Sequence, residues 1–262
     1  MSFATSKSAH PLQDATTPLR FRIREWAACA PGLLTQHEWL AWSANPQPPL
    51  PSGNDIPPVT AMAPMLRRRL AHLGRAALHC VYGIGQAGTQ NPLVFASRHG
   101  ETTRLRPMLA DLAAGEPLSP TAFGLAVHNA IGALHSIDRG DTSVMQAVAA
   151  GRDTIETAIV EAVGLLADGY EEVAVVACDA PLDPAYSDFV DEPECLYAWA
   201  WSIGHAAAGA PAFSLTQVNA DDGEACAALL PHGLEVLRFM LGQGHTLEYR
   251  GQRSTWIWQR HD

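Results

Sequence analysis

The sequence predicts an α/β protein in which layers of helices cover a sheet, and three observations predict it. A continuous apolar run in EEVAVVACDAP, residues 171–181, is typical of a strand buried on both faces. Strong helical periodicity covers residues 64–82 and 152–168, and the second helix leads directly into that strand. This alternation is typical of layered α/β folds, so we expect one domain over residues 21–262 after a flexible N-terminus of residues 1–20.

The beginning of the domain predicts a strand, a capped helix and a connector. FRIREWAAC, residues 21–29, alternates apolar and charged side chains as a strand does. In TQHEWLAWS, residues 35–43, Thr35 can cap a short helix, and Glu38, three residues later, completes a capping box. The proline-rich stretch 45–58 is too broken for regular structure and predicts a connector.

The middle of the chain continues the alternation of helices and strands. Pro64 stands where the helix over 64–82 can begin. We expect a strand in NPLVFASRHG, residues 91–100, which ends in a glycine turn. Small and apolar residues then predict further helices, and these lie at 102–114 and 121–134, with a turn at 138–140.

The stretch SVMQAVAAGRDTIETA, residues 143–158, predicts a strand, a tight turn and a helix. We expect the turn to hold residues 146–150, and Glu156 and Glu161 to face solvent on the helix. Many α/β enzymes present a nucleophile at such a turn, yet residues 146–150 include no Cys, Ser, Thr or Lys. Beyond the buried strand we expect mixed strands, a helix around 222–241 and two short strands in TLEYRGQRSTWIWQR.

Composition and charge exclude several classes of protein. The net charge of −10 argues against nucleic-acid binding through a basic face, and we interpret the local cluster Arg67–Arg69 as the solvated or interface face of a helix. No uncharged apolar run reaches the roughly 20 residues of a membrane span, and MSFATSKSAH has no apolar core of a signal peptide. We therefore expect a cytoplasmic protein.

The cysteines and histidines predict no metal site and no cofactor. The five cysteines are odd in number and widely spaced, without a CxxC pair, which indicates reduced thiols. No histidine stands at a metal-binding spacing. The acidic segment DPAYSDFVDEPE, residues 183–194, could hold a metal, but prolines favour a solvated loop. GIGQAG, residues 83–88, matches GxGxxG, yet a helix precedes it and a strand follows, which is the reverse of a dinucleotide site.

Several segments, in order, resemble the core of the β-ketoacyl synthases of the thiolase superfamily. They are LSPTAFGLAVHNAIGALHSI and TSVMQAVAAGRDTIETAIVEAVGLLADGYEEVAVVACD, with PMLRRRLAHLGRAAL and VFASRHGETTRL adding to the match. The chain resembles the truncated ketosynthase-like subunits called chain-length factors in type II systems that make aryl-polyene pigments. The resemblance implies a thiolase-like layered α/β/α fold, essentially one half of a ketosynthase.

The same resemblance implies a vacated active site. Aligned on Gly151, the nucleophilic cysteine of the family falls at Val148, and valine cannot form a thioester. The second half of a ketosynthase, with its two catalytic histidines, has no counterpart in this chain, so we expect no catalytic residue here. A partner, a full-length β-ketoacyl synthase, would perform the condensation in a heterodimer, and acyl carrier protein would bind transiently.

In that heterodimer this chain would shape the acyl tunnel of the partner. Phe123 and Val127, just ahead of Asn129, are the residues that we expect to reach toward the tunnel, unless both are core residues. Gln146 and Val148 mark the vacated site. An isolated half of such an architecture would expose apolar surface.

Two alternatives remain open at the level of sequence. The chain could be a stand-alone acyl-thioester enzyme that uses Cys178, although a cysteine at a buried strand end is more often a core residue. It could also be a docking module for acyl carrier protein, which is acidic and would favour the Arg67–Arg69 cluster.

Overall fold

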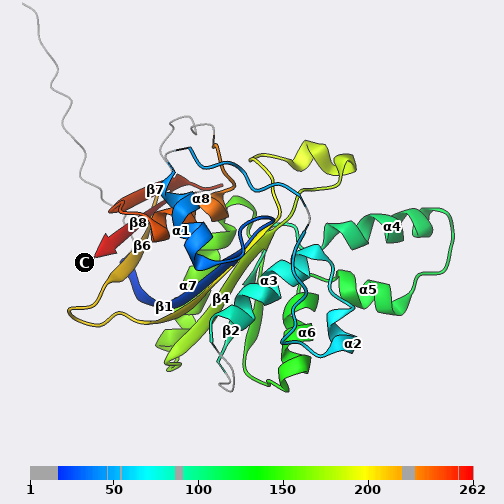
Figure 1. Ribbon diagram of the computed structural model, residues 1–262, viewed down its shortest axis with the longest axis horizontal. Helices are drawn as coiled ribbons and strands as arrows, with labels where there is room; N and C mark the ends of the chain where they lie inside the picture. The colour runs from blue at the N-terminus through cyan, green and yellow to red at the C-terminus, as the bar shows by residue number, and fades with distance from the viewer. Residues whose placement is uncertain are drawn as a thin grey trace, which may run out of the picture.

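A computed structural model describes residues 17–45, 47–53, 55–85, 91–219, 228–252 and 254–261. Within them, eight strands form one mixed sheet in the order β3-β2-β4-β5-β1-β6-β8-β7 (Figure 1). The strands are β1 Leu19–Cys29, β2 Leu93–Ala96, β3 Met145–Val148, β4 Glu172–Asp179, β5 Tyr197–His205, β6 Ala212–Asn219, β7 Thr246–Arg250 and β8 Ser254–His261. Strands β3, β2 and β4 run parallel, and the remaining pairs are antiparallel.

Helices cover both faces of this sheet, which confirms the predicted layers. They are α1 Gln36–Ala44, α2 Pro64–Arg67, α3 His72–Gly83, α4 Thr102–Ala113, α5 Pro120–Ala126, α6 Ala130–Arg139, α7 Thr154–Ala167 and α8 His232–Leu241, with 3-10 turns η1 Gly151–Asp153 and η2 Pro184–Phe189. The capping box of α1 is formed, because Glu38 N donates to Thr35 Oγ1 (3.3 Å) and Thr35 N donates to Glu38 Oε2 (2.8 Å). Within the described residues, no helix is both long and apolar enough to span a bilayer.

The core divides between the two faces of the sheet because side chains alternate along each strand. On one face, α7, α8 and α1 pack against large aromatic side chains that include Trp199, Trp201 and Trp258. On the other face, α3 and α6 pack against Phe95 of β2 and against smaller side chains of β4 and β5, such as Val176 and Ala200. Full burial of a Val, Leu, Ile, Phe or Met side chain contributes about 1.5–3 kcal/mol, so the apolar side chains on both faces stabilise the sheet.

Two predicted helices are each broken in two. The segment 64–82 forms α2 and α3, and the exposed carbonyl of Arg69 in the break accepts a hydrogen bond from Arg104 Nη2 (2.5 Å). The segment 121–134 forms α5 and α6, and in that break His128 Nε2 donates to Ser97 O (2.8 Å). Each break is stabilised by a partner distant in sequence, which helical periodicity does not reveal.

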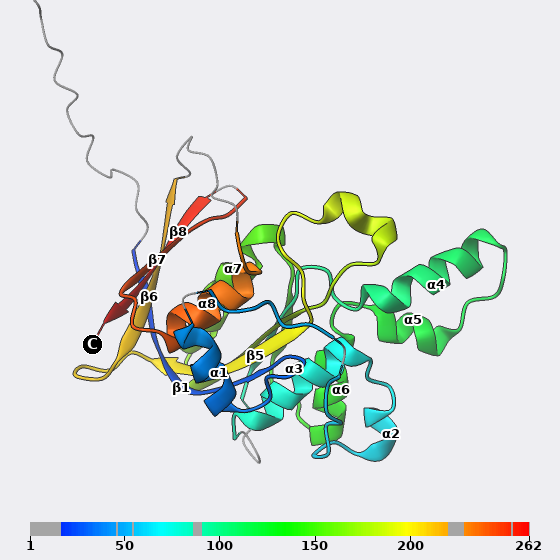
Figure 2. The same ribbon diagram turned by 45° about the horizontal axis from the view of Figure 1, so that its top comes forward.

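The C-terminal strands cover the central helix α7. Figure 2 shows β6, β8 and β7 rising beside α7 and α8, while β1 and β5 run beneath them. Trp256 and Trp258 of β8 and Tyr249 of β7 contact this side of the core. The chain therefore supplies its own cover for a layer that we expected an isolated half to leave exposed.

Candidate functional site

The carboxyl ends of the three parallel strands, β3, β2 and β4, lie side by side. In the register of the sheet, Ala96 pairs with Val148 of β3 and with Ala177 of β4. The predicted turn over 146–150 is shorter than expected, because Gln146 to Val148 belong to the ladder of β3 with β2. Val148 is thus the last residue of its strand, and the turn proper begins at Ala149.

Backbone hydrogen bonds fix the turn that follows Val148. Ser97 N donates to Val148 O (3.2 Å), which ties the end of β3 to the end of β2. Ala150 N donates to Thr154 Oγ1 (3.0 Å), and Thr154 Oγ1 donates to Gly151 O (2.7 Å). Gly151 has φ +57°, the left-handed conformation that glycine adopts without strain. The turn is well ordered, but it presents no nucleophilic side chain.

The C-terminal hairpin holds the next residues of this turn. The Asp153 carboxylate accepts hydrogen bonds from Trp256 Nε1 (3.0 Å) and from Gln252 N (3.1 Å). Tyr249 OH donates to Arg152 O (3.1 Å). Strands β7 and β8 therefore fix η1, which begins three residues after Val148.

Glu156 is buried, which corrects the prediction that it faces solvent. Its side chain is 0 % exposed, and its Oε1 accepts hydrogen bonds from His232 Nε2 (2.6 Å) and Trp258 Nε1 (2.9 Å). The Tyr249 ring stacks on the His232 ring at a centroid distance of 3.2 Å. The helical pattern of α7 shows only its own face, and the cover from α8 and β8 comes from far along the chain. Glu161, on the same helix, is half-buried.

The carboxylates raise the proton affinity of His232. Burial alone would lower the pKa of His232, but Glu156, with a smaller contribution from Glu235, raises this pKa to about 9. His232 is therefore protonated at neutral pH and forms a buried ion pair with Glu156. Sequence reasoning missed this pair, because the two residues stand 76 positions apart without a motif.

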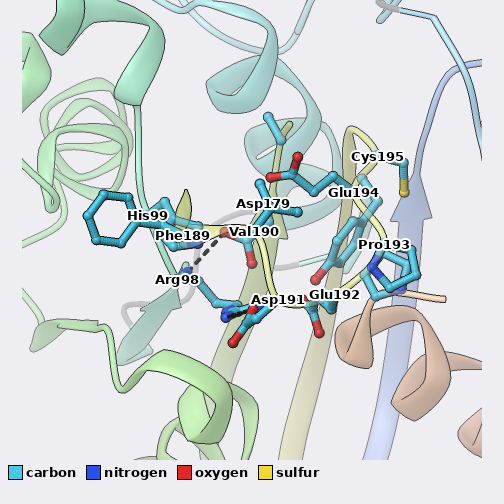
Figure 3. Close-up of a pocket in the computed structure, with 13 residues that line it drawn as sticks. Arg98, His99, Asp179, Phe189, Val190, Asp191, Glu192, Pro193, Glu194 and Cys195 are labelled. Atoms are coloured by element: carbon cyan, nitrogen blue, oxygen red, sulfur yellow. Dashed lines mark hydrogen bonds and ion pairs between the residues drawn. The ribbon is translucent and has the colours of Figure 1, made fainter. Parts of the chain in front are cut away.

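Asp179 is the last residue of β4 and lies at the same carboxyl end of the parallel strands. Its Oδ1 accepts hydrogen bonds from Ser97 Oγ and Arg98 N, both at 2.9 Å. Removal from bulk water raises the pKa of Asp179 to about 7, although these hydrogen bonds act to lower it. Figure 3 shows Asp179 beside a small hollow whose wall continues into the acidic loop, residues 180–196.

The acidic loop pairs with an arginine. Arg98 forms ion pairs with Asp191 (2.6 Å) and Glu192 (2.7 Å). Across the described residues, no group of three or more His, Cys, Asp or Glu side chains is placed to hold a metal ion.

The residues predicted to reach toward a partner lie on the surface. Phe123, on α5, has a relative exposure of 59 %, and Val127, directly after α5, is also exposed. Asn129 precedes α6, and Gln146 lies on β3; both are exposed. Phe123 and Val127 are therefore not core residues of this chain.

Cys178 lies in the core, as do the other described cysteines. It is fully buried against the layer of α3, and burial raises the pKa of its thiol well above the usual range. Cys29, Cys80 and Cys195 are also buried and free. Cys226 and residues 86–88 of the glycine-rich segment lie outside the described residues. A buried, protonated thiol is a poor nucleophile.

Comparison with known proteins agrees with this geometry. The sequence-family model of the β-ketoacyl synthase N-terminal domain matches residues 39–259. A chain from the complex of the ketosynthase ApeO with its chain length factor ApeC, from Xenorhabdus doucetiae, superposes with a TM-score of 0.77 at 28 % identity, over 92 % of this chain and 99 % of that one. None of the curated proteins gives a match.

Two more distant structures share the fold. The ishigamide ketosynthase/chain length factor matches with a TM-score of 0.56 at 16 % identity, over 75 % of this chain and 65 % of that one. A chain from the AntDE:AntF complex, a type II polyketide acyl-carrier protein with its ketosynthase, matches with a TM-score of 0.54 at 11 % identity, over 72 % of this chain and 64 % of that one. The predicted thiolase-like α/β architecture is confirmed, and the chain belongs to the β-ketoacyl synthase family, of which it carries the N-terminal domain.

Proposed function

We propose that this chain is a non-catalytic subunit of the chain-length-factor type, which pairs with a catalytic β-ketoacyl synthase and completes its acyl tunnel. The observation that carries this proposal is Val148. It ends β3 at the position where the resemblance places the nucleophilic cysteine, and an isopropyl group has neither a proton to lose nor a lone pair to attack with. The partner would supply the nucleophile and the two histidines of the condensation.

The edge of the sheet supports a partner at this site. Among the described strands, β3 is an edge strand of the sheet, because it forms a ladder only with β2. Its Gln146 and Ala147 side chains are exposed. An open strand edge is a template for pairing with another chain, and a protein covers such an edge when it assembles. A heterodimer through β3 would place the partner next to Val148.

Exposed apolar side chains on α5 support a role in the tunnel. Phe123 and Val127 present an aromatic ring and a branched side chain to solvent, next to the break at His128. In a heterodimer they would project into the cavity of the partner. Bulk at the end of such a cavity limits the acyl chain, because one further extension unit would overpack it.

Co-expression with a β-ketoacyl synthase encoded beside this gene tests the proposal. We expect a one-to-one complex by pull-down and by size-exclusion chromatography with light scattering. An activated acyl thioester should label only the cysteine of the partner. The proposal would be refuted if the chain is stable alone and does not bind the synthase, or if the chain itself is acylated.

A second function, docking of acyl carrier protein, is favoured by the cluster Arg67–Arg69. In the described part of the chain, these three guanidinium groups form no ion pair, although the net charge is −10. The cluster has a fixed backbone, because Arg104 donates to Arg69 O and Ala63 N donates to Asp138 Oδ1 (2.9 Å). Replacing the three arginines by glutamate should weaken capture of an acidic carrier protein and leave pairing with the ketosynthase intact.

A further inference from the structure

The acidic loop, residues 180–196, is a compact structure. It joins β4 to β5, which are antiparallel neighbours, and its ends meet at the pair Asp179 and Tyr197. At its neck, Leu182 N donates to Glu194 Oε1 (2.9 Å). The loop is therefore closed at its base, and compact surface loops of this kind frequently carry function.

Three other elements hold the loop from outside. Arg98, after β2, pairs with Asp191 and Glu192 at 2.6 and 2.7 Å. Arg106 of α4 approaches Asp183 at 3.3 Å. His232 N, at the start of α8, donates to Glu192 Oε2 (3.1 Å). These contacts fix the flanks of the loop and leave its tip free.

The tip of the loop exposes apolar side chains among acidic ones. Phe189 ends η2 with 67 % of its side chain exposed, and Val190 beside it is also exposed. In Figure 3 the Phe189 ring projects away from the carboxylates of Asp191 and Glu192. Asp188 is exposed next to it, and residues 180–196 contain five carboxylates and no Lys, Arg or His. Arg98 and Arg106 pair with three of these carboxylates, whereas Asp188 forms no ion pair among the described residues. A fixed loop thus presents an aromatic side chain next to an exposed, unpaired carboxylate, and it keeps an excess of negative charge.

A second group of exposed apolar side chains lies on α4, which an ion pair links to the loop. Leu105, Leu109 and Leu112 form an exposed stripe on α4, at intervals of four and three residues. Figures 1 and 2 both show α4, α5 and the η2 segment projecting from the same side of the molecule. The Arg106–Asp183 ion pair links α4 to the loop, and α4 packs against α5, which carries Phe123. Single exposed apolar residues are ordinary, but a stripe of three on one helix, on the same side of the molecule as an exposed aromatic tip, indicates an interaction surface.

We infer that the tip of the acidic loop, with the exposed stripe of α4, is a second contact surface for the partner ketosynthase, and that the partner receives Phe189 in an apolar socket with a basic rim. This inference rests on the proposed function. The Arg106–Asp183 ion pair links the loop to α4, and α4 packs against α5, which that function assigns to the partner. The charge of the loop favours a basic rim and disfavours an acidic carrier protein, since like charges at an interface are repelled. Aromatic side chains seated in pockets dominate the affinity of many interfaces.

The test measures dissociation of the co-purified complex of the full chain with its ketosynthase, by mass photometry over a dilution series. Phe189→Ser and Asp188→Lys should each raise the Kd at least tenfold, and Asp188→Lys should also reduce its dependence on salt. Leu229→Ser and Glu248→Lys are the matched controls, because they change an exposed leucine and an exposed carboxylate on other elements. Both controls should leave the Kd unchanged.

Each outcome separates the two proposals. A wild-type complex whose Kd is unaffected by Phe189→Ser and Asp188→Lys would overturn the contact surface and leave the proposed function standing. Failure of the wild-type chain to pair at all would overturn both. Capture of carrier protein that depends on Phe189, with ketosynthase pairing unchanged, would also overturn this assignment. Thermal unfolding of each variant shows whether the fold is intact, and we expect no change since both side chains are exposed.

Discussion

The Nε2 atom of His232 lies 2.6 Å from Oε1 of Glu156, between α8 and α7, where neither side chain reaches bulk solvent. Trp258 donates to the same carboxylate oxygen from β8. One buried ion pair therefore joins two helices and the C-terminal hairpin around the turn that follows Val148.

Removal of one partner of this pair should destabilise the protein. In His232→Leu the Glu156 carboxylate stays buried without its cation, and such a change costs about 3–5 kcal/mol of unfolding free energy. The double variant Glu156→Gln/His232→Leu should lose less than the sum of the two single changes. Urea unfolding measures both, with Glu161→Gln on the same helix as the control. If Glu161→Gln and His232→Leu lower the free energy of unfolding equally, the buried Glu156–His232 ion pair is not the cause of the loss.

The same pair predicts a dependence of stability on alkaline pH. The pKa of His232 is about 9 in the folded protein, against 6.5 for the free side chain. Because the folded pKa is raised, the contribution of His232 is complete below pH 6.5 and is lost as pH rises through 9. Wild-type protein should lose on the order of 3 kcal/mol more than His232→Leu between pH 6 and pH 10. Unfolding curves at the two pH values test this, and parallel losses would argue against it.

Asp179 should act in a lower window of pH, which overlaps that of His232 only near pH 7. Its folded pKa is raised from 3.8 to about 7, so its contribution is complete below pH 3.8 and is lost as pH rises through 7. Asp179→Asn keeps an oxygen acceptor for Ser97 and Arg98 and has no proton to lose. We expect Asp179→Asn to have a larger free energy of unfolding than the wild-type protein at pH 8. This difference in unfolding free energy should vanish near pH 4. The side chain keeps some contact with solvent, so the slope stays below the limit of about 1.4 kcal/mol per pH unit.

Phe123 should control product length in the complex. Phe123→Ala would open space at the end of the tunnel and lengthen the product by at least one extension unit, whereas Phe123→Trp would shorten it. Mass spectrometry of carrier-bound products reports the change. Leu40→Ala, on the exposed side of α1, is the control for loss of a surface apolar side chain. An identical product distribution for all three variants would remove Phe123 from the tunnel.

The described thiols should be unreactive in the native protein. In a Cys226→Ser variant the remaining four cysteines are all buried, and burial raises the pKa of Cys178 well above its usual range. We expect a thiol reagent at pH 7 to leave them unmodified for minutes and to modify all four in denaturant. Rapid labelling of Cys178 in the native protein would instead support the alternative that the chain is a stand-alone enzyme using this thiol.

Local patterns predicted much of the fold, and distant contacts account for most of what they missed. The capping box at Thr35 and the buried strand β4 are signals within one element, and both formed as expected. The breaks at Arg69 and His128 depend on hydrogen bonds to residues 35 and 31 positions away, which no window of helical periodicity includes.

Some of the geometry around position 148 could be expected from the sequence, and some could not. The assignment of Val148 to the nucleophile position rests on the resemblance, aligned on Gly151, and stays a prediction. Glu156 was placed on the wrong side of α7, because only tertiary structure shows that α8 and β8 cover that face. Asp179 follows a buried strand and was visible in the sequence, yet its proximity to Ser97 required the parallel order of β2 and β4.

The hairpin of β7 and β8 also has a consequence for the order of folding. Asp153 and Glu156 meet their tryptophan partners at separations of 103 and 102 residues, so these contacts close very long loops. Contacts of such high sequence separation form late. On the ribosome, β3 and α7 would emerge well before the strands that cover them, with an uncovered helix face and an open strand edge exposed together. The hydrogen bonds that hold Asp153 and Glu156 in place, close to Val148, therefore form only after β8 has been translated.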